Sequence, residues 1–219
     1  MTTPTRPAIV GSGNIGSALA RLFARAGIEI SIANTRGPES ISELASSIGP
    51  GVHAVPLEET LASDLIFMAI PFGAVEQFGT SLPDWTGKTV VDTTNAHYKP
   101  NWEAIVGGRT SAQYVAEHLD GAKIVKAFNQ LSANTLQAEL DPEVGRRVIF
   151  IATDSPQAGD EIADLVGNLG LAAVQLGAWV SNGFSGAGAR RERIGAVRWA
   201  LRWRSAGKFW WVCFTFAAG

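Results

Sequence analysis

A glycine-rich turn near the N-terminus carries the residues whose types and spacing could do chemistry. Three glycines stand there at the spacing G-x-G-x-x-G, after a short apolar stretch and before a stretch with the apolar face of a helix. In a strand–turn–helix unit, the first glycine permits a tight turn, the second lets a pyrophosphate approach the backbone, and the third lets helix and strand pack closely. The N–H groups at the start of the helix favour negative charge. We therefore predict a dinucleotide phosphate site at Gly11, Ser12, Gly13, Asn14, Ile15 and Gly16.

The end of the next apolar stretch, residues 28–33, selects the coenzyme. An NAD site usually has Asp or Glu at this position, where it accepts a hydrogen bond from the ribose 2′-hydroxyl. This chain has Asn34 there, followed by Thr35 and Arg36. A guanidinium and a hydroxyl would bind a 2′-phosphate, which a carboxylate would repel. The pattern predicts NADP(H) rather than NAD(H). The alternatives are that Arg36 is an ordinary solvated arginine and that the glycine turn binds nothing.

Apolar stretches of strand length alternate with helical stretches along most of the chain. This alternation predicts an α/β fold: a Rossmann-like, doubly wound, mainly parallel sheet with helices on both faces. Strands are expected at residues 7–10, 28–33, 52–55, 65–70, 88–92, 123–127, 148–152 and 172–176. Helices are expected at residues 14–23, 37–48, 57–62, 73–78, 111–119, 133–140 and 156–169, with a long polar and aromatic connection at 93–108.

The carboxyl ends of the predicted parallel strands should form the ligand-binding edge, as in other open α/β sheets. The segments that directly follow these strands are therefore expected to line the site. They are residues 11–16, 34–36, 69–72, 92–96 and 127–130.

Five segments in a fixed order resemble the NADPH-dependent reductases of the deazaflavin coenzyme F420. They read GSGNIGSALA, IANTRGPES, FMAIPFGAV, VVDTTN and KIVKAFNQL, and the resemblance covers residues 7–183. The glycine motif alone is shared with many unrelated enzymes, whereas the ordered set is much more specific. Pyrroline-5-carboxylate reductases and the NADPH-binding domain of metalloreductases are similar in pattern. The resemblance implies an oxidoreductase that transfers a hydride between NADP(H) and coenzyme F420.

The resemblance also assigns roles to residues of this chain. It implies that the turn at 12–15 holds the pyrophosphate, and that Thr35 and Arg36 hold the 2′-phosphate. Ser40 stands near a position where archaeal members often have a lysine, which would weaken the NADP preference without reversing it. The remaining residues that it places at the coenzymes are Ala69, Ile70, Pro71 and Val75 beside the nicotinamide, and Asn95 and Asn129 beside the deazaflavin.

Hydride transfer between two stacked rings asks little of side chains beyond close approach, correct facing and the exclusion of water. We therefore predict no catalytic acid–base group and no metal site, and the histidines and the cysteine lack the spacing of metal ligands. His97 could contact substrate or be a solvated loop residue. Asp92 is interpreted as a cap or turn residue, and Tyr98 and Trp102 as either part of a lid or simple packing.

Two other functions fit the same residues. One is an NADPH-dependent reductase of a flavin or an imine acceptor. The other is an NADP(H)-binding sensor module without turnover, because plain binding and hydride transfer between coenzymes leave the same sparse pattern. Turnover of NADPH with oxidised F420, with a flavin, or with neither separates the three.

Composition and charge favour small-molecule partners. The formal net charge of −2 gives no nucleic-acid footprint. The single cysteine cannot form an intrachain disulfide, so nothing points to an oxidising compartment. The first residues lack a signal-peptide pattern, and the longest uncharged apolar run, 209–218, is too short to span a bilayer. A cytoplasmic protein without a membrane partner is expected, and a homodimer is left open.

The last 36 residues, 184–219, differ in composition from the body at 1–183, and we predict a domain boundary there. They hold seven Lys or Arg but one acid, and four of the seven tryptophans of the chain. Three interpretations compete. Residues 190–204 could form a basic amphipathic helix for an acidic partner or a membrane surface. The tryptophans could pack on the body or on a second subunit. The stretch could also be read in the wrong frame, since an out-of-frame GC-rich gene encodes such a composition.

Overall fold

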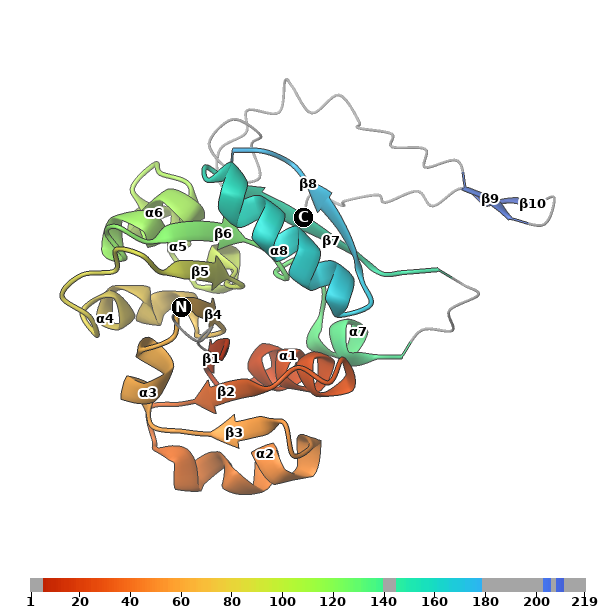
Figure 1. Cartoon of the computed structure of the whole chain (residues 1–219). Helices are drawn as coiled ribbons and strands as arrows, with labels where there is room; N and C mark the ends of the chain where they lie inside the picture. The colour runs from red at the N-terminus through yellow and green to blue at the C-terminus, as the bar shows by residue number, and fades with distance from the viewer. Residues whose placement is uncertain (1–5, 140–144, 179–202, 206–207, 211–219) are drawn as a thin grey trace. The chain divides into compact units, whose positions relative to one another are not determined.

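The computed structural model describes residues 6–139, 145–178, 203–205 and 208–210 (Figure 1). The chain divides into two compact units, residues 1–188 and 189–219. In the second unit, strands β9 (Trp203–Ser205) and β10 (Lys208–Trp210) pair antiparallel. The three interpretations of the tail concern residues that lie almost entirely outside the described part, and the boundary near residue 184 stays a prediction.

Eight strands of the first unit form one sheet. Its order is β3-β2-β1-β4-β5-β6-β7-β8, and neighbouring strands are parallel except for β6 and β7. The strands are β1 (Ala8–Val10), β2 (Ile30–Ala33), β3 (Val52–Ala54), β4 (Leu65–Met68), β5 (Thr89–Asp92), β6 (Lys123–Lys126), β7 (Val148–Thr153) and β8 (Ala172–Gln175).

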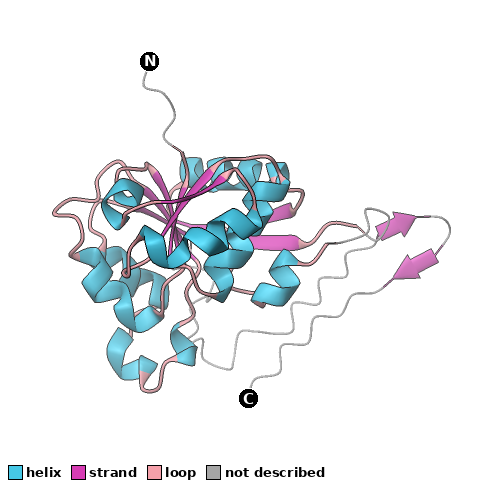
Figure 2. Cartoon of the chain, turned by 90° about the horizontal axis from the view of Figure 1, so that it is seen from below, coloured by secondary structure: helices cyan, strands magenta, loops and turns pink. Residues whose placement is uncertain are grey.

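Helices cover both faces of this sheet (Figure 2). The residues of α1 (Asn14–Arg25), α2 (Ser42–Ile48), α7 (Ala133–Gln137) and α8 (Pro156–Asn168) pack in one core. The residues of α3 (Leu57–Leu61), α4 (Val75–Gly79), α5 (Trp102–Val106) and α6 (Ser111–His118) pack in the other. Three short 3-10 turns complete the unit: η1 (Pro38–Ile41), η2 (Phe72–Ala74) and η3 (Ala96–Tyr98).

Alternation along the buried strands explains the two cores. Successive side chains of a strand point to opposite faces of the sheet. In β4, Phe67 therefore lies in the core with α1, while Ile66 and Met68 lie in the core with α4. In β6, Val125 and Ile124 divide in the same way. Strands covered on both faces need the continuous apolar runs that the sequence has.

The predicted Rossmann-like, doubly wound fold is confirmed, with two differences in detail. The connection at 93–108 contains η3 and α5, which the sequence did not predict because elements this short show no apolar period. Strand β7 runs antiparallel to β6. The direction of a strand depends on how its connection returns to the sheet, which the apolar pattern does not encode.

Candidate functional site

The strand order reverses between β1 and β4, and in open α/β sheets ligands bind in the crevice at such a reversal, outside the carboxyl ends of the strands. Hydrogen bonds join the chain just beyond the strands here. The Gly11 N–H donates to the Ala33 carbonyl at 2.8 Å, and the Ala69 N–H donates to the Val10 carbonyl at 2.8 Å. The segments predicted to line the site after β1, β2 and β4 therefore meet at one edge.

Two of the three motif glycines are required by the fold itself. Gly11 has a φ of +112°, and a Cβ there would overlap the carbonyl oxygen of Ala69. A Cβ at Gly16 would overlap the carbonyl oxygen of Gly11 and press on the side chain of Ile9. These glycines bring β1, β4 and the first helix into close contact, as the motif predicts.

Gly13 is different, because nothing in the protein demands a glycine there. Its φ is −74°, which any residue adopts, and a Cβ would have no atom within 4 Å. The residue is the N-cap of α1, no side chain caps the helix, and its first turn holds no acid. Gly13 and Asn14 are exposed. Open approach to an uncapped helix start fits a pyrophosphate.

Asn34 joins the two predicted coenzyme loops. Its Nδ2 donates to Ser12 Oγ at 3.0 Å and to Ser40 Oγ at 3.0 Å, and its Oδ1 accepts from the Arg36 N–H at 2.8 Å. Both amide hydrogens of Asn34 are thus used within the protein. The side chain orients the loops around it, and Ser40 in turn donates to the Gly37 carbonyl at 2.7 Å.

The backbone of Arg36 is fixed while its side chain is available. Thr35 and Arg36 are exposed, and among the described residues the guanidinium has no hydrogen bond or ion pair. No carboxylate stands at the end of β2, where Asn34 is neutral. A cation on an ordered loop beside the start of α1 can bind a further phosphate group.

The four residues predicted beside the nicotinamide divide into two kinds. Ala69 and Ile70 are half-buried and Pro71 is exposed, all directly after β4 at the carboxyl edge. Val75 begins α4 and is fully buried within the core on that face. A contact between Val75 and the coenzyme stays a prediction.

The structure brings Asn95 and Asn129 together from two separate loops. The Asn95 Nδ2 donates to the Asn129 carbonyl at 2.8 Å, and the Asn129 Nδ2 donates to Asn95 Oδ1 at 3.2 Å. In the turn after β6, Phe128, directly before Asn129, has a φ of +61°, a conformation that is rare for a bulky residue. Phe128 is fully buried and packs edge-on against Phe67, which holds the turn in place.

An ion pair that the sequence reading missed lies beside these loops. The Lys126 Nζ lies 2.8 Å from Asp92 Oδ2, and both side chains are buried. Asp92 also accepts from the Thr94 N–H at 2.8 Å, so the turn role expected for it is present. The sequence does contain a signal for this pair: an acid and a lysine end two neighbouring apolar strands. Buried charges need partners, so two such residues are expected to pair.

The aromatic residues after β5 do not share one role. Trp102 is half-buried and packs against the core beside α4. His97 and Tyr98 are exposed, with ring centroids 4.3 Å apart, and Tyr98 is 78% exposed. Trp102 is therefore a packing residue. Contact with substrate stays a prediction for His97, and a place in a lid stays a prediction for Tyr98.

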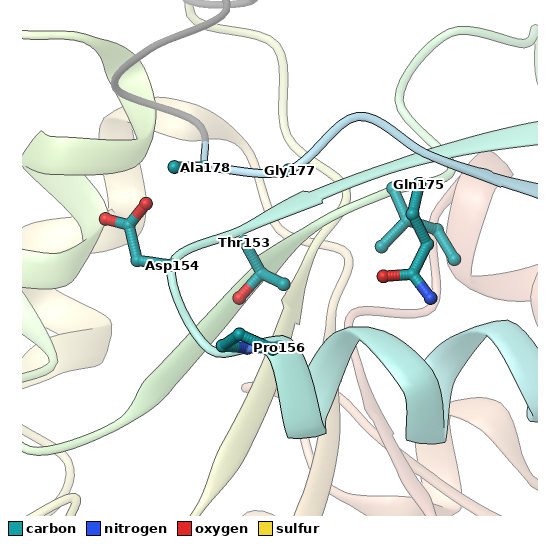
Figure 3. Close-up of a pocket in the computed structure, with 7 residues that line it drawn as sticks. Thr153, Asp154, Pro156, Gln175, Gly177 and Ala178 are labelled. Carbon is teal, nitrogen blue, oxygen red and sulfur yellow. The ribbon is translucent and has the colours of Figure 1, made fainter.

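A cavity of about 390 Å³ lies away from the predicted site (Figure 3). Thr153 and Asp154 at the end of β7, Pro156 at the start of α8 and Gly177 beyond β8 line it. Because β7 is antiparallel to β6, its carboxyl end lies at the sheet edge opposite to the ends of β1, β4 and β5. The glycine turn and this cavity are therefore on opposite edges.

Comparison with known proteins now decides the family. The family described as NADP oxidoreductase coenzyme F420-dependent matches residues 6–96. A crystal structure of the hypothetical protein SMa0349 from Sinorhizobium meliloti is 42% identical, covers 80% of this chain and 85% of its own, and has a TM-score of 0.74. Residues 6–96 of the chain belong to the coenzyme F420-dependent NADP oxidoreductase family. Its fold is Rossmann-type, and the matching family is described as one of NADP oxidoreductases.

Two further similar proteins have lower sequence identity to this chain. A structure of a proposed F420-dependent NADP reductase from Arthrobacter sp. FB24 is 24% identical over 79% of this chain and 85% of its own, with a TM-score of 0.65. The metalloreductase STEAP3 of Rattus norvegicus is 26% identical over 79% of this chain. The chain spans about a third of the length of the curated metalloreductases that it matches. No helix of the described residues is long and apolar enough to cross a membrane.

Proposed function

We propose that this chain binds NADP(H) in the crevice between β1 and β4 and transfers a hydride between it and coenzyme F420. One observation carries the coenzyme part of the proposal. An uncapped helix start, open at Gly13, lies next to a loop that presents the exposed Arg36 guanidinium and has the neutral Asn34, in place of a carboxylate, at the end of β2. This arrangement suits a pyrophosphate and a 2′-phosphate together.

The residues of the chain would each do a limited task. When bound, the nicotinamide supplies a hydride from C4, and the deazaflavin accepts it at C5. The turn at 12–15 would bind the pyrophosphate, while Thr35 and Arg36 would bind the 2′-phosphate. Ala69, Ile70 and Pro71 would exclude water beside the nicotinamide. The loops after β5 and β6, which Asn95 and Asn129 join, would support the acceptor ring.

The family description supports F420 as the acceptor. The STEAP metalloreductases show that chains with related sequences also occur in proteins named for a different reduction. The acceptor is therefore the part of the proposal that needs direct measurement.

Anaerobic mixing of the protein with NADPH and oxidised F420 tests the proposal. We expect the visible absorbance of F420 to fall with a matching loss of NADPH absorbance. Turnover with a flavin but not with F420 would replace the acceptor. Tight NADPH binding without turnover of F420, a flavin or a cyclic imine would instead identify a sensor module.

A further inference from the structure

The buried ion pair at the ends of β5 and β6 has no part in the coenzyme site described above. Asp92 and Lys126 are register partners in the sheet, and their side chains are 0% and 5% exposed. Their positions at the carboxyl ends of the two strands put them directly beneath the loops at 93–96 and 127–130.

Stability alone does not account for such a pair. Removing two charges from water costs several kcal/mol per ion, and a well-packed apolar replacement is often as stable. Breaking one member is harmful, because the other charge is left unpaired in the interior. A buried pair is thus best explained by the geometry that it fixes.

The pair fixes both backbone groups of Thr94. The Thr94 N–H donates to Asp92 Oδ1 at 2.8 Å, and Lys126 Nζ donates to the Thr94 carbonyl at 2.6 Å. Before it, Thr93 Oγ1 donates to the Met68 carbonyl at the end of β4 at 3.0 Å. After it, Asn95 is bonded to Asn129. The loop after β5 is therefore tied to the loops on both sides of it.

The same two loops contain polar atoms that lack partners. Thr94 Oγ1 and Gln130 Oε1 are buried and have no hydrogen bond among the described residues. Unsatisfied buried polar atoms are uncommon in native proteins and often mark a place where a ligand or water belongs. A planar acceptor whose edge carries C=O and N–H groups could supply such partners.

We propose that Lys126 is a positioning residue. Together with Asp92, it acts through Thr94 to hold the loops at 93–96 and 127–130 in the geometry for hydride transfer. The inference rests on the proposed function. It predicts that loss of the pair leaves coenzyme binding intact, because the Gly11–Gly16 turn and Arg36 do not contact it. The transfer step depends on alignment within about 1 Å, so this step should slow by about tenfold to 100-fold.

The test compares the double variant D92N/K126M with the wild type. The double variant removes both charges, so neither is left unpaired in the interior, and methionine is an unbranched side chain only one atom shorter than lysine. Lys123→Met is the matched control, because Lys123 is on the same strand at the opposite edge of the sheet. Four quantities are measured: the melting temperature, the Kd for NADPH, the single-turnover rate of F420 reduction, and amide hydrogen exchange at 93–96 and 127–130.

We expect the double variant to keep the melting temperature and the NADPH Kd, to lose about tenfold to 100-fold in the single-turnover rate, and to exchange faster in the two loops. The Lys123→Met control should match the wild type in all four. Wild-type rates and unchanged exchange in the double variant would overturn the inference and leave the proposed function standing. A parallel loss of folding and of NADPH binding in the double variant would also overturn the inference, because it would indicate a purely structural role for the pair. A wild type that binds NADPH but reduces neither F420 nor a flavin would overturn both.

Discussion

Arg36 is the residue on which coenzyme choice should depend. Its guanidinium is exposed and unpaired among the described residues, and its backbone N–H is held by Asn34. We expect Arg36→Gln to weaken NADPH binding by about 1.5–3 kcal/mol, one to two decades in Kd, because a charge-assisted contact is lost. Titration of protein fluorescence with NADPH and with NADH measures this.

NADH lacks the 2′-phosphate, so its Kd should change little in the Arg36→Gln variant. Arg6→Gln is the matched control, since Arg6 precedes β1 at the opposite edge of the sheet and pairs with Glu29. Equal losses for NADPH and NADH would contradict a role for Arg36 at the extra phosphate.

Asn34 allows the charge of the loop to be changed with little change in its geometry. In Asn34→Asp, a carboxylate can still accept from the Arg36 N–H and from the hydroxyls of Ser12 and Ser40. It adds a negative charge where the 2′-phosphate is expected and offers an acceptor to a ribose hydroxyl. The ratio of the Kd values for NADPH and NADH should therefore move toward NADH by at least about tenfold.

A melting temperature close to that of the wild type would show that this substitution preserves the loops. A variant that kept the wild-type preference for NADPH would argue against the proposed place of the extra phosphate. It would do so independently of the result for Arg36.

Single residues also show where reading the sequence succeeds and where it stops. The glycine roles at positions 11 and 16 follow from the motif, since close backbone approach is the reason for the motif. The residue type of Asn34 does not predict that both of its amide hydrogens are donated within the protein, because an asparagine can equally donate to a ligand. The partnership of Asp92 with Lys126 required the sheet register.

Among the elements, the start of α1 contains one glycine that ligand binding should require, Gly13, and one that the fold requires, Gly16. Gly13→Ala places a methyl group in open space but puts alanine at the N-cap of α1, so the free energy of unfolding should fall by only about 1 kcal/mol. NADPH binding should weaken at least about tenfold, because the methyl group occupies the approach of the pyrophosphate. Gly167→Ala in α8 is the control, since a Cβ there also meets nothing.

Gly16→Ala should behave in the opposite way. The added Cβ overlaps the Gly11 carbonyl, so we expect a loss of about 3 kcal/mol in the free energy of unfolding. Urea denaturation of the three variants gives the comparison. A Gly13 variant that binds NADPH as the wild type does would mean that no phosphate group lies against this turn.

Most of the elements could be predicted because each is a buried strand or a helix with an apolar face. Strands β1, β4 and β5 are covered on both sides, which leaves a continuous apolar run in the sequence. The five-residue helix α5 is too short for its period to show. The antiparallel direction of β7 matters more, because it moves the cavity beyond β7 and β8 to the edge opposite the glycine turn.

At the scale of the whole molecule, the described body contains what the fold needs. Both cores and the eight-stranded sheet are formed by residues between Ala8 and Gln175. We therefore expect a variant that ends at Gly183 to unfold cooperatively, with a melting temperature within about 4 °C of the full chain. Calorimetry of both proteins measures this, and a much larger decrease would mean that residues 184–219 stabilise the body.

The central claim is that NADP(H) occupies the crevice at the start of α1, with its extra phosphate at Arg36. A crystal structure of the protein with NADPH tests this most directly. The account predicts the pyrophosphate against the backbone of Gly13 and its neighbours, and the 2′-phosphate within hydrogen-bonding distance of the Arg36 guanidinium. Density for NADPH at any other place, or a crevice left empty at saturating NADPH, would contradict it.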